Sequence, residues 1–427
     1  MTNYNSPDLV RSRRAYMVQS VTEHFVYLLV TDAYLAKLLA HIGMSDALIG
    51  IVSSFVTLAF VFQIMSFFVV KMKIGAKRTV MLFDTVSIFF FMLMYFVPLM
   101  PIPSGAKSTL IVISILIAYF GRYTIFSLCY KWANSYVEPS KRGIFTSVKE
   151  IVSLVAGIAF SLIAGFFTDR FDRADNIEGS FLFIAILLFA VNICNFTALL
   201  KIRKEDASIN SDGVETIPVV LKNTLGNKNF KSVIKLTVLW EVAKYFTVGF
   251  IGIYKTKDLM LSILGVQLIN IAGNLTRALI SKSLGRYSDK HSYAKGFKLG
   301  LLFAAGAFFI NMFTTRASRF LIIPYTVLYC CATGGVNQNS FNITYSYVDM
   351  KYVTQAMAIK NCIGGLCGFG ASLIAGRILH AIQSNGNIIL GVHINGQQIL
   401  SGISLLITII AILYVKNVIE KQKIIVQ

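Results

Sequence analysis

Long apolar stretches are the feature that most constrains the fold of this chain. Twelve of them reach the length of about 20 residues that a helix needs to cross the hydrocarbon core of a bilayer. A membrane β-barrel is disfavoured, because its strands would alternate apolar and polar residues over about ten positions, whereas runs such as Phe181–Val191 are unbroken. The sequence therefore predicts an all-α membrane protein with twelve transmembrane helices. The predicted spans are 18–40, 46–70, 79–100, 109–131, 144–168, 180–200, 233–254, 259–281, 296–314, 319–345, 355–380 and 398–415.

The composition agrees with a lipid-facing exterior. Hydrophobic residues make up 56% of the 427 residues and charged residues only 14%, compared with about a quarter charged in soluble domains. The six cysteines all fall within predicted spans, in no spacing typical of a metal site or a disulfide framework. The first span lacks a cleavage site of small residues and is expected to be retained.

The basic residues predict the orientation of the chain in the membrane. The formal net charge is +20, and Lys and Arg concentrate by about three to one in the loops on one side of the predicted spans. Because positive loops stay in the cytoplasm, both termini are expected to be cytoplasmic, with the protein in the cell membrane. The excess of positive charge is thus explained by the orientation in the membrane, with some attraction to anionic lipid. No nucleic-acid partner is expected.

The chain contains an internal repeat at a constant offset. The segment SLIAG occurs at 161–165 and again at 372–376, which is 211 residues later. Lys149 and Lys360 precede the two copies by the same distance, and Gly157 matches Gly368. Parallel repeats related by an axis along the membrane normal are a known transporter design, in which two similar halves rock about a central site.

A polar segment over residues 201–231 divides the predicted spans into six and six. The predicted organisation is an N-terminal six-helix bundle over 1–200, a cytoplasmic linker loop over 201–231 and a C-terminal six-helix bundle over 232–427.

Two short motifs carry a resemblance to a known family. The segment GRYSDK at 285–290 resembles the loop motif of the major facilitator superfamily, and Trp132 followed by PSKRG at 139–143 is similar to a second stretch found in many members. The segment KEIVSLVAG at 149–157 looks closest to a bacterial branch of that family. The resemblance covers the whole chain and implies two pseudo-symmetric six-helix bundles that transport a solute by alternating access.

The two loops that correspond to the family's motif differ in how well they match it. After the second span, Met72 stands where the family's motif has an acid and Phe68 where it has a glycine, so that loop keeps its positive charge but lacks the acid of a charge relay. The second loop is better preserved: Gly285, Asp289 and Lys290 are expected to form a gate in which Asp289 pairs with a basic residue or a helix N-terminus. The alternative is a short basic turn.

Polar residues inside the first six spans are candidates for function, because they are costly in lipid. Arg122 lies near the middle of the fourth span and is expected to bind an anionic substrate group or to pair with an acid. On the first span, Glu23, Tyr27, Thr31 and Tyr34 are spaced to share one helix face toward the cavity.

Three carboxylates in this half are candidates for proton coupling, since a carboxyl group in a low-dielectric site can take up a proton near neutral pH. Glu23 is the first, although it could simply be solvated at the cytoplasmic interface. Asp32 lies off the Glu23 face and could pair with Lys37. Glu150 in the fifth span is the third.

The second half has its own polar faces. Gln267, Asn270 and Asn274 follow each other at helical spacing in the eighth span, and Asn337 lies on a polar face of the tenth. These amides are interpreted as cavity lining, with hydrogen bonding between helices as the alternative. Glu241 and Lys244, three residues apart, form either an ion pair within the helix or a proton switch.

These features together predict a function. The sequence contains no Walker-type phosphate loop, so the chain is expected to be a secondary active transporter of a small solute, driven by protons and acting as a monomer without a cofactor. It is not expected to be an enzyme, and the repeat argues against an ATP-driven permease subunit. The alternatives left open are a non-transporting sensor on the same scaffold and a drug-efflux antiporter.

Overall fold

The computed structural model describes residues 6–65, 75–134, 136–138, 142–203, 226–347, 353–389 and 391–422. By their contacts these residues form two compact units. Unit 1 contains 6–44, 62–203 and 262–264 of the described residues, and unit 2 contains 45–61, 226–261 and 265–422 with the same gaps. The predicted linker over 201–231 and the loop around Met72 lie mostly outside the described residues, so the predicted division at 200 and 232 stays a prediction.

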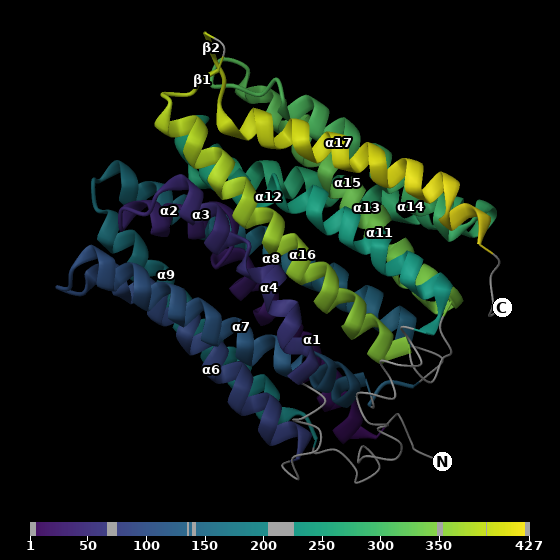
Figure 1. Ribbon diagram of the computed structural model, residues 1–427. Coiled ribbons are helices and arrows are strands. Elements are labelled where there is room, and N and C mark those ends of the chain that lie inside the picture. The colour runs from purple at the N-terminus through teal and green to yellow at the C-terminus, as the bar shows by residue number, and fades with distance from the viewer. Residues whose placement is uncertain are drawn as a thin grey trace. The chain divides into compact units, whose positions relative to one another are not determined.

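Unit 1 is built from long helices (Figure 1). They are α1 (Pro7–Leu29), α2 (Asp32–His41), α6 (Ala76–Phe96), α7 (Ser104–Asn134), α8 (Arg142–Arg173) and α9 (Ile177–Lys201), with the short 3-10 turn η2 (Val97–Leu99). The 3-10 turn η1 (Ala59–Met65) belongs to unit 2 up to Val61 and to unit 1 from Phe62. The helix α9 begins where the side chain of Asn176 accepts a hydrogen bond from the Gly179 amide at 2.8 Å, as an N-cap residue does.

Unit 2 holds the remaining elements. They are α3 (Asp46–Ser53), α4 (Phe55–Leu58), α11 (Lys228–Tyr245), α12 (Val248–Ile253), the π-helical turn η5 (Tyr254–Asp258), α13 (Ile263–His291), α14 (Tyr293–Asn311), η6 (Arg319–Leu321), α15 (Ile322–Tyr347), α16 (Val353–Ser384), β1 (Ile388–Ile389), β2 (Val392–His393), α17 (Gly396–Asn417) and η8 (Ile419–Lys421). The two short strands pair antiparallel in the connection between α16 and α17.

Eleven of the predicted spans correspond to helices that are long and apolar enough to cross a membrane, counted over the described residues. The first predicted span, 18–40, is absent from this set. The structure divides it between α1, whose 23 residues include several charged ones, and α2, which has only 10 residues. The break centres on Asp32, whose φ of +50° lies in the left-handed region that Asp tolerates better than most residues. An all-helical membrane fold is confirmed, and the number of twelve helices is not.

The outward helix faces carry large apolar side chains. Leu82 on α6 is 63% exposed, Ile186 on α9 is 56% exposed and Leu279 on α13 is 80% exposed. Water-soluble monomers rarely expose so many large apolar side chains on neighbouring helix faces. The surface is therefore suited to contact with lipid, in agreement with a multi-pass membrane protein.

Within unit 1, α6 packs against α7 and α9, and α1 packs against α8 and α9 (Figure 1). Trp132, the tryptophan of the family-like stretch, is fully buried in the core at one end of α7. Its indole Nε1 donates to the hydroxyl of Tyr136 at 2.9 Å and to the carbonyl of Arg203 at 3.3 Å. This residue therefore fixes the end of α7 against the chain that leaves α9.

Within unit 2, α16 packs closely on α3, α4 and α11. Glycines permit the close approach: a Cβ atom at Gly365 would lie 2.4 Å from the carbonyl oxygen of Thr57, and one at Gly376 would lie 2.8 Å from Ile51. The hydroxyl of Thr57 donates to the carbonyl of Gly365 at 3.3 Å. Small residues here let helix backbones meet, as is common between membrane helices.

The repeated residues make similar contacts in the two units. A Cβ at Gly157 of α8 would lie 2.5 Å from His24 of α1, and one at Gly368 of α16 would lie 3.0 Å from Tyr245 of α11. In both units, then, the repeated glycine faces a ring from the helix packed against it. The repeat preserves a helix–helix contact.

Candidate functional site

A guanidinium group lies between two carboxylates in unit 1. Nη2 of Arg122, on α7, is 3.4 Å from Oε2 of Glu23 on α1. Nη1 of the same residue is 3.5 Å from Oδ1 of Asp84 on α6. The sequence predicted that Arg122 would meet either an anionic group or an acid, and the structure brings it to two acids on two different helices.

The two carboxylates differ in their access to solvent. The side chain of Asp84 is completely buried, whereas that of Glu23 is 32% exposed. An ionised carboxylate in an apolar bundle needs an opposite charge and hydrogen bonds. Asp84 obtains both within the bundle, and Glu23 remains within reach of a cavity.

Asp84 and its partner Asn195 were not among the residues singled out from the sequence. Nδ2 of Asn195, on α9, donates to Oδ2 of Asp84 at 2.6 Å, and the hydroxyl of Thr22 donates to Oδ1 of Asn195 at 3.0 Å. Asn195 is fully buried. The available signal was an acid inside the apolar third span, but only the packing of α6, α7 and α9 places it beside Arg122.

A cavity of about 370 Å³ opens beside Arg122. Its lining combines acidic, basic and hydroxyl side chains from three helices of unit 1: Ser20, Glu23, His24, Tyr27, Arg122, Lys149, Glu150 and Ser153. Four residues predicted from the sequence, Arg122, Tyr27, Glu23 and Glu150, thus lie in one place. The cavity can accommodate a polar solute that carries charges of both signs.

Lys149 brings a second positive charge to this cavity. Its Nζ atom donates to the hydroxyl of Tyr16 at 3.2 Å and lies 4.7 Å from the centre of the Tyr16 ring. Its repeat partner Lys360 is only 3% exposed, and its Nζ atom donates to Oγ of Ser340 at 2.9 Å. Hydroxyl groups therefore hold both repeated lysines.

The predicted polar face of the first span is interrupted. Because α1 ends at Leu29, Thr31 does not continue the face of Glu23 and Tyr27; its hydroxyl donates to the carbonyl of Tyr27 at 2.8 Å. Asp32 is the first residue of α2. Lys37, its proposed partner, forms an ion pair with Asp172 of α8.

In unit 2, the predicted pair of Glu241 and Lys244 is present on α11. Nζ of Lys244 lies 2.9 Å from Oε2 of Glu241, and both side chains are mostly buried. Glu241 also packs on α16, where a Cβ at Gly364 or Gly368 would lie 3.3 Å from its side chain. The structure agrees with the interpretation as an ion pair within the helix, and a proton-switch role remains a prediction.

The amides of the second half differ in their burial. Gln267 is 2% exposed on α13, and Asn274 is partly buried. Oδ1 of Asn270 accepts a hydrogen bond from Nζ of the buried Lys255 at 3.2 Å. Asn337 is exposed on α15. Their role as cavity lining remains a prediction.

The predicted gating motif is helical. Gly285, Asp289 and Lys290 belong to the last turns of α13, and the chain turns only at Ser292, whose side chain caps α14. Asp289 and Lys290 are exposed, and among the described residues Asp289 forms no ion pair. Its gating role remains a prediction.

No metal centre is apparent in the part of the chain that the structure describes, where no three His, Cys, Asp or Glu side chains come together in a suitable group.

Solved structures with the same fold are transporters. The nucleoside transporter NupG aligns with a TM-score of 0.71 and 13% identity, over 98% of this chain and 100% of that one. An auto-inhibited POT family peptide transporter aligns with a TM-score of 0.73 and 11% identity, over 98% of each chain. A D-xylose-proton symporter aligns with a TM-score of 0.69 and 12% identity, over 93% of this chain and 96% of that one. At these identities the likeness shows the fold alone.

Sequence comparison gives the family. No curated protein matches the chain by sequence. The family model described as Major Facilitator Superfamily matches residues 25–372, which is most of the chain and includes helices of both units. The family match, the transporter fold and the many apolar helices agree with one another. The chain therefore belongs to the Major Facilitator Superfamily and is a multi-pass membrane transporter.

Proposed function

We propose that the protein is a proton-coupled secondary transporter that moves a small polar solute across the cell membrane by alternating access. It has twelve transmembrane helices in two pseudo-symmetric bundles over 1–200 and 232–427, with both termini in the cytoplasm. The helices α1 and α2 together form the first span, which brings the eleven long apolar helices to twelve. The constant offset of the repeat and the bias of basic residues support this arrangement.

One observation carries the proton coupling: Arg122 lies between a carboxylate that is sealed in the bundle and one that reaches a cavity. With both acids ionised, the three groups carry a net charge of −1 in a medium of low dielectric. Protonation of Glu23 removes that charge and weakens its attraction to Arg122. Glu23 is the acid that lines the cavity, so we assign it the coupling role and assign Asp84 the role of the buried counter-charge to Arg122.

The lining of the cavity suggests the class of solute. Arg122 and Lys149 supply positive charge and Glu23 and Glu150 supply negative charge, with Tyr27 adding an exposed aromatic ring. Such a site suits a zwitterionic or anionic solute with an organic body. The similar structures are those of a nucleoside transporter, a peptide transporter and a D-xylose-proton symporter, so a dipeptide, a nucleoside and D-xylose form the first test panel.

Solute-driven proton entry into proteoliposomes tests the proposal. Purified protein is reconstituted with a pH-sensitive dye inside, and each solute of the panel is added outside at a fixed pH. A transported solute is expected to acidify the interior. The change Glu23→Gln is expected to abolish the acidification, because an amide cannot carry the proton, while exchange of labelled solute across the membrane persists.

The experiment has a control variant and three outcomes that would contradict parts of the proposal. Glu178→Gln removes an exposed acid at the start of α9 in the same unit and is expected to leave proton entry unchanged. Solute flux without proton movement would disprove the coupling but not the transport. A solute that raises thermal stability but never crosses would favour the sensor, and expulsion of amphiphilic drugs would favour the efflux antiporter.

Other candidate residues are assigned in the same proposal. Asp32 lies at the hinge between α1 and α2, Asn337 and the α13 amides line the route in unit 2, and Asp289 with its neighbours closes the cytoplasmic side. We propose a monomer as the working unit, since each half supplies its own polar residues.

A further inference from the structure

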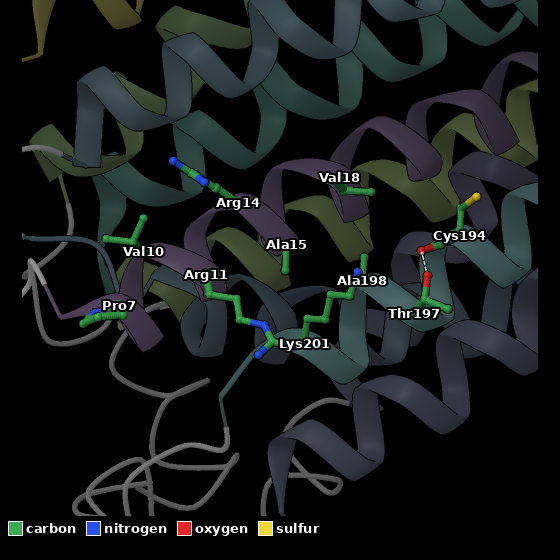
Figure 2. Close-up of a pocket in the computed structure, with 10 residues that line it drawn as sticks. All are labelled: Pro7, Val10, Arg11, Arg14, Ala15, Val18, Cys194, Thr197, Ala198 and Lys201. Carbon is green, nitrogen blue, oxygen red and sulfur yellow. Dashed lines mark hydrogen bonds between the residues drawn. The ribbon is translucent and has the colours of Figure 1, made fainter.

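A second cavity in unit 1 lies apart from Arg122 and plays no part in the proposed transport site. It has a volume of about 490 Å³ and is lined by the start of α1 and the end of α9 (Figure 2). These two helices pack against each other. The lining residues of this α1–α9 groove are Pro7, Val10, Arg11, Arg14, Ala15, Val18, Cys194, Thr197, Ala198 and Lys201.

The groove is positively charged at one end. Arg11, Arg14 and Lys201 are exposed, and none of the ten lining residues is acidic. Figure 2 shows Arg11 extending from α1 toward Lys201 at the end of α9. Within the described residues these three cations form no ion pair, so their charge is available to a ligand.

The rest of the groove is apolar except for Thr197, whose hydroxyl donates to the carbonyl of Cys194 at 2.9 Å. Val18 lies seven positions after Arg11 on α1, and Cys194 lies seven positions before Lys201 on α9. At a rise of about 1.5 Å per residue, both walls therefore extend about 10 Å from the cationic end. Val18 is 48% exposed on this surface. The groove therefore offers a cationic mouth and an apolar floor side by side, which matches a ligand with an anionic head and a hydrocarbon tail.

We propose that the α1–α9 groove binds an acidic phospholipid of the inner leaflet, with its phosphate at Arg11 and Lys201 and the upper part of an acyl chain along Val18 and Cys194. Basic pockets between membrane helices on the cytoplasmic side recognise such headgroups, and the fork of a guanidinium matches phosphate oxygens. The inference uses the membrane location and does not depend on which solute is transported.

Lipid binding to the full-length protein tests the proposal. Native mass spectrometry of the purified protein is done with phosphatidylglycerol, with phosphatidylcholine of the same acyl chains, and with glycerol phosphate alone. We expect phosphatidylglycerol to bind at least tenfold more tightly than the other two. The double change Arg11→Ala and Lys201→Ala is expected to remove that preference, whereas Arg170→Ala with Arg173→Ala, an equal loss of charge at the end of α8, is expected to keep it.

A second measurement needs no variant. Of the six cysteines, all of which lie in the described residues, only Cys194 is exposed. In nanodiscs containing phosphatidylglycerol, maleimide labelling of Cys194, followed by peptide mass spectrometry, should be at least threefold slower than in phosphatidylcholine nanodiscs. Equal labelling and equal affinity for both lipids would overturn the proposal, as would tight binding of glycerol phosphate alone, which would indicate a site for a free anion.

Discussion

At the scale of single residues, Asp84 shows how a charge is kept inside an apolar bundle. Its carboxylate is completely buried, receives a hydrogen bond from Asn195 and faces Arg122. If one partner of a buried ion pair is removed, the other charge stays buried without compensation. This loss lowers the stability of the fold by more than the intact pair contributes to it. Asp84 and Asn195 are therefore expected to behave as parts of one network.

The change Asn195→Ala tests that network. It deletes the Asn195 donor to the buried carboxylate of Asp84, and the loss of that hydrogen bond is expected to cost about 1–3 kcal/mol of stability. The Thr22 hydroxyl keeps an acceptor in the carbonyl of Gln19 at 2.8 Å. The loss is measured as a lower apparent Tm of the purified protein.

The matched control is Asn192→Ala, one turn earlier on α9. Its Oδ1 atom is buried without a hydrogen-bond partner in the described part of the chain, so its loss should matter little. If both variants melted at the same temperature, the hydrogen bond between Asn195 and Asp84 would not contribute measurably to the stability of the protein.

At the scale of helices, the two predictions that needed revision concern where helices begin and end. The first span was predicted as one element but bends at Asp32, and the GRYSDK motif was expected in a loop but extends α13 to His291. In both places polar residues interrupt an apolar run. Hydropathy shows where an apolar run ends. A helix ends where its last backbone groups find hydrogen-bond partners outside the helix, so the end of the apolar run and the end of the helix need not coincide.

Glycine on α16 provides a test at this scale. The change Gly365→Ala would place a Cβ atom 2.4 Å from the carbonyl oxygen of Thr57, which is backbone and cannot move aside as a side chain can. Overpacking of this kind is expected to cost about 1–3 kcal/mol and to lower the apparent Tm.

Gly370→Ala is the control on the same helix, because no atom lies within 4 Å of the corresponding Cβ position. It is expected to melt at or slightly above the wild-type temperature, since Ala favours helix more than Gly does. A Gly365→Ala protein as stable as Gly370→Ala would show that the contact between α16 and α4 is looser than described.

At the scale of the whole molecule, the bias of basic residues makes a topological prediction. An epitope inserted after residue 105 should lie outside the cell, and one inserted near residue 215 should lie in the cytoplasm. Antibody binding to intact cells, compared with permeabilised cells, distinguishes the two. Both epitopes on the same side would be incompatible with twelve spans and cytoplasmic termini.

The sequence by itself determined the class of protein. Eleven of the predicted spans coincide with long apolar helices in the described residues, because burial of about 20 apolar residues in lipid is a local property that composition reports directly. The family resemblance was likewise readable from short motifs, and the family match confirms it. Arg122, Glu23, Tyr27 and Glu150 could be selected because polar residues are rare in such spans.

Only the tertiary structure decided which of these residues meet. Glu23, Asp84, Arg122 and Asn195 come from four helices that are far apart in the sequence, and hydropathy contains no information on how helix faces are paired. Asp84 was overlooked for this reason: one acid in an apolar run has no evident partner until α6 is packed between α7 and α9. The spans follow from transfer of each segment into lipid, whereas the site follows from contacts between segments, which exist only in the folded bundle.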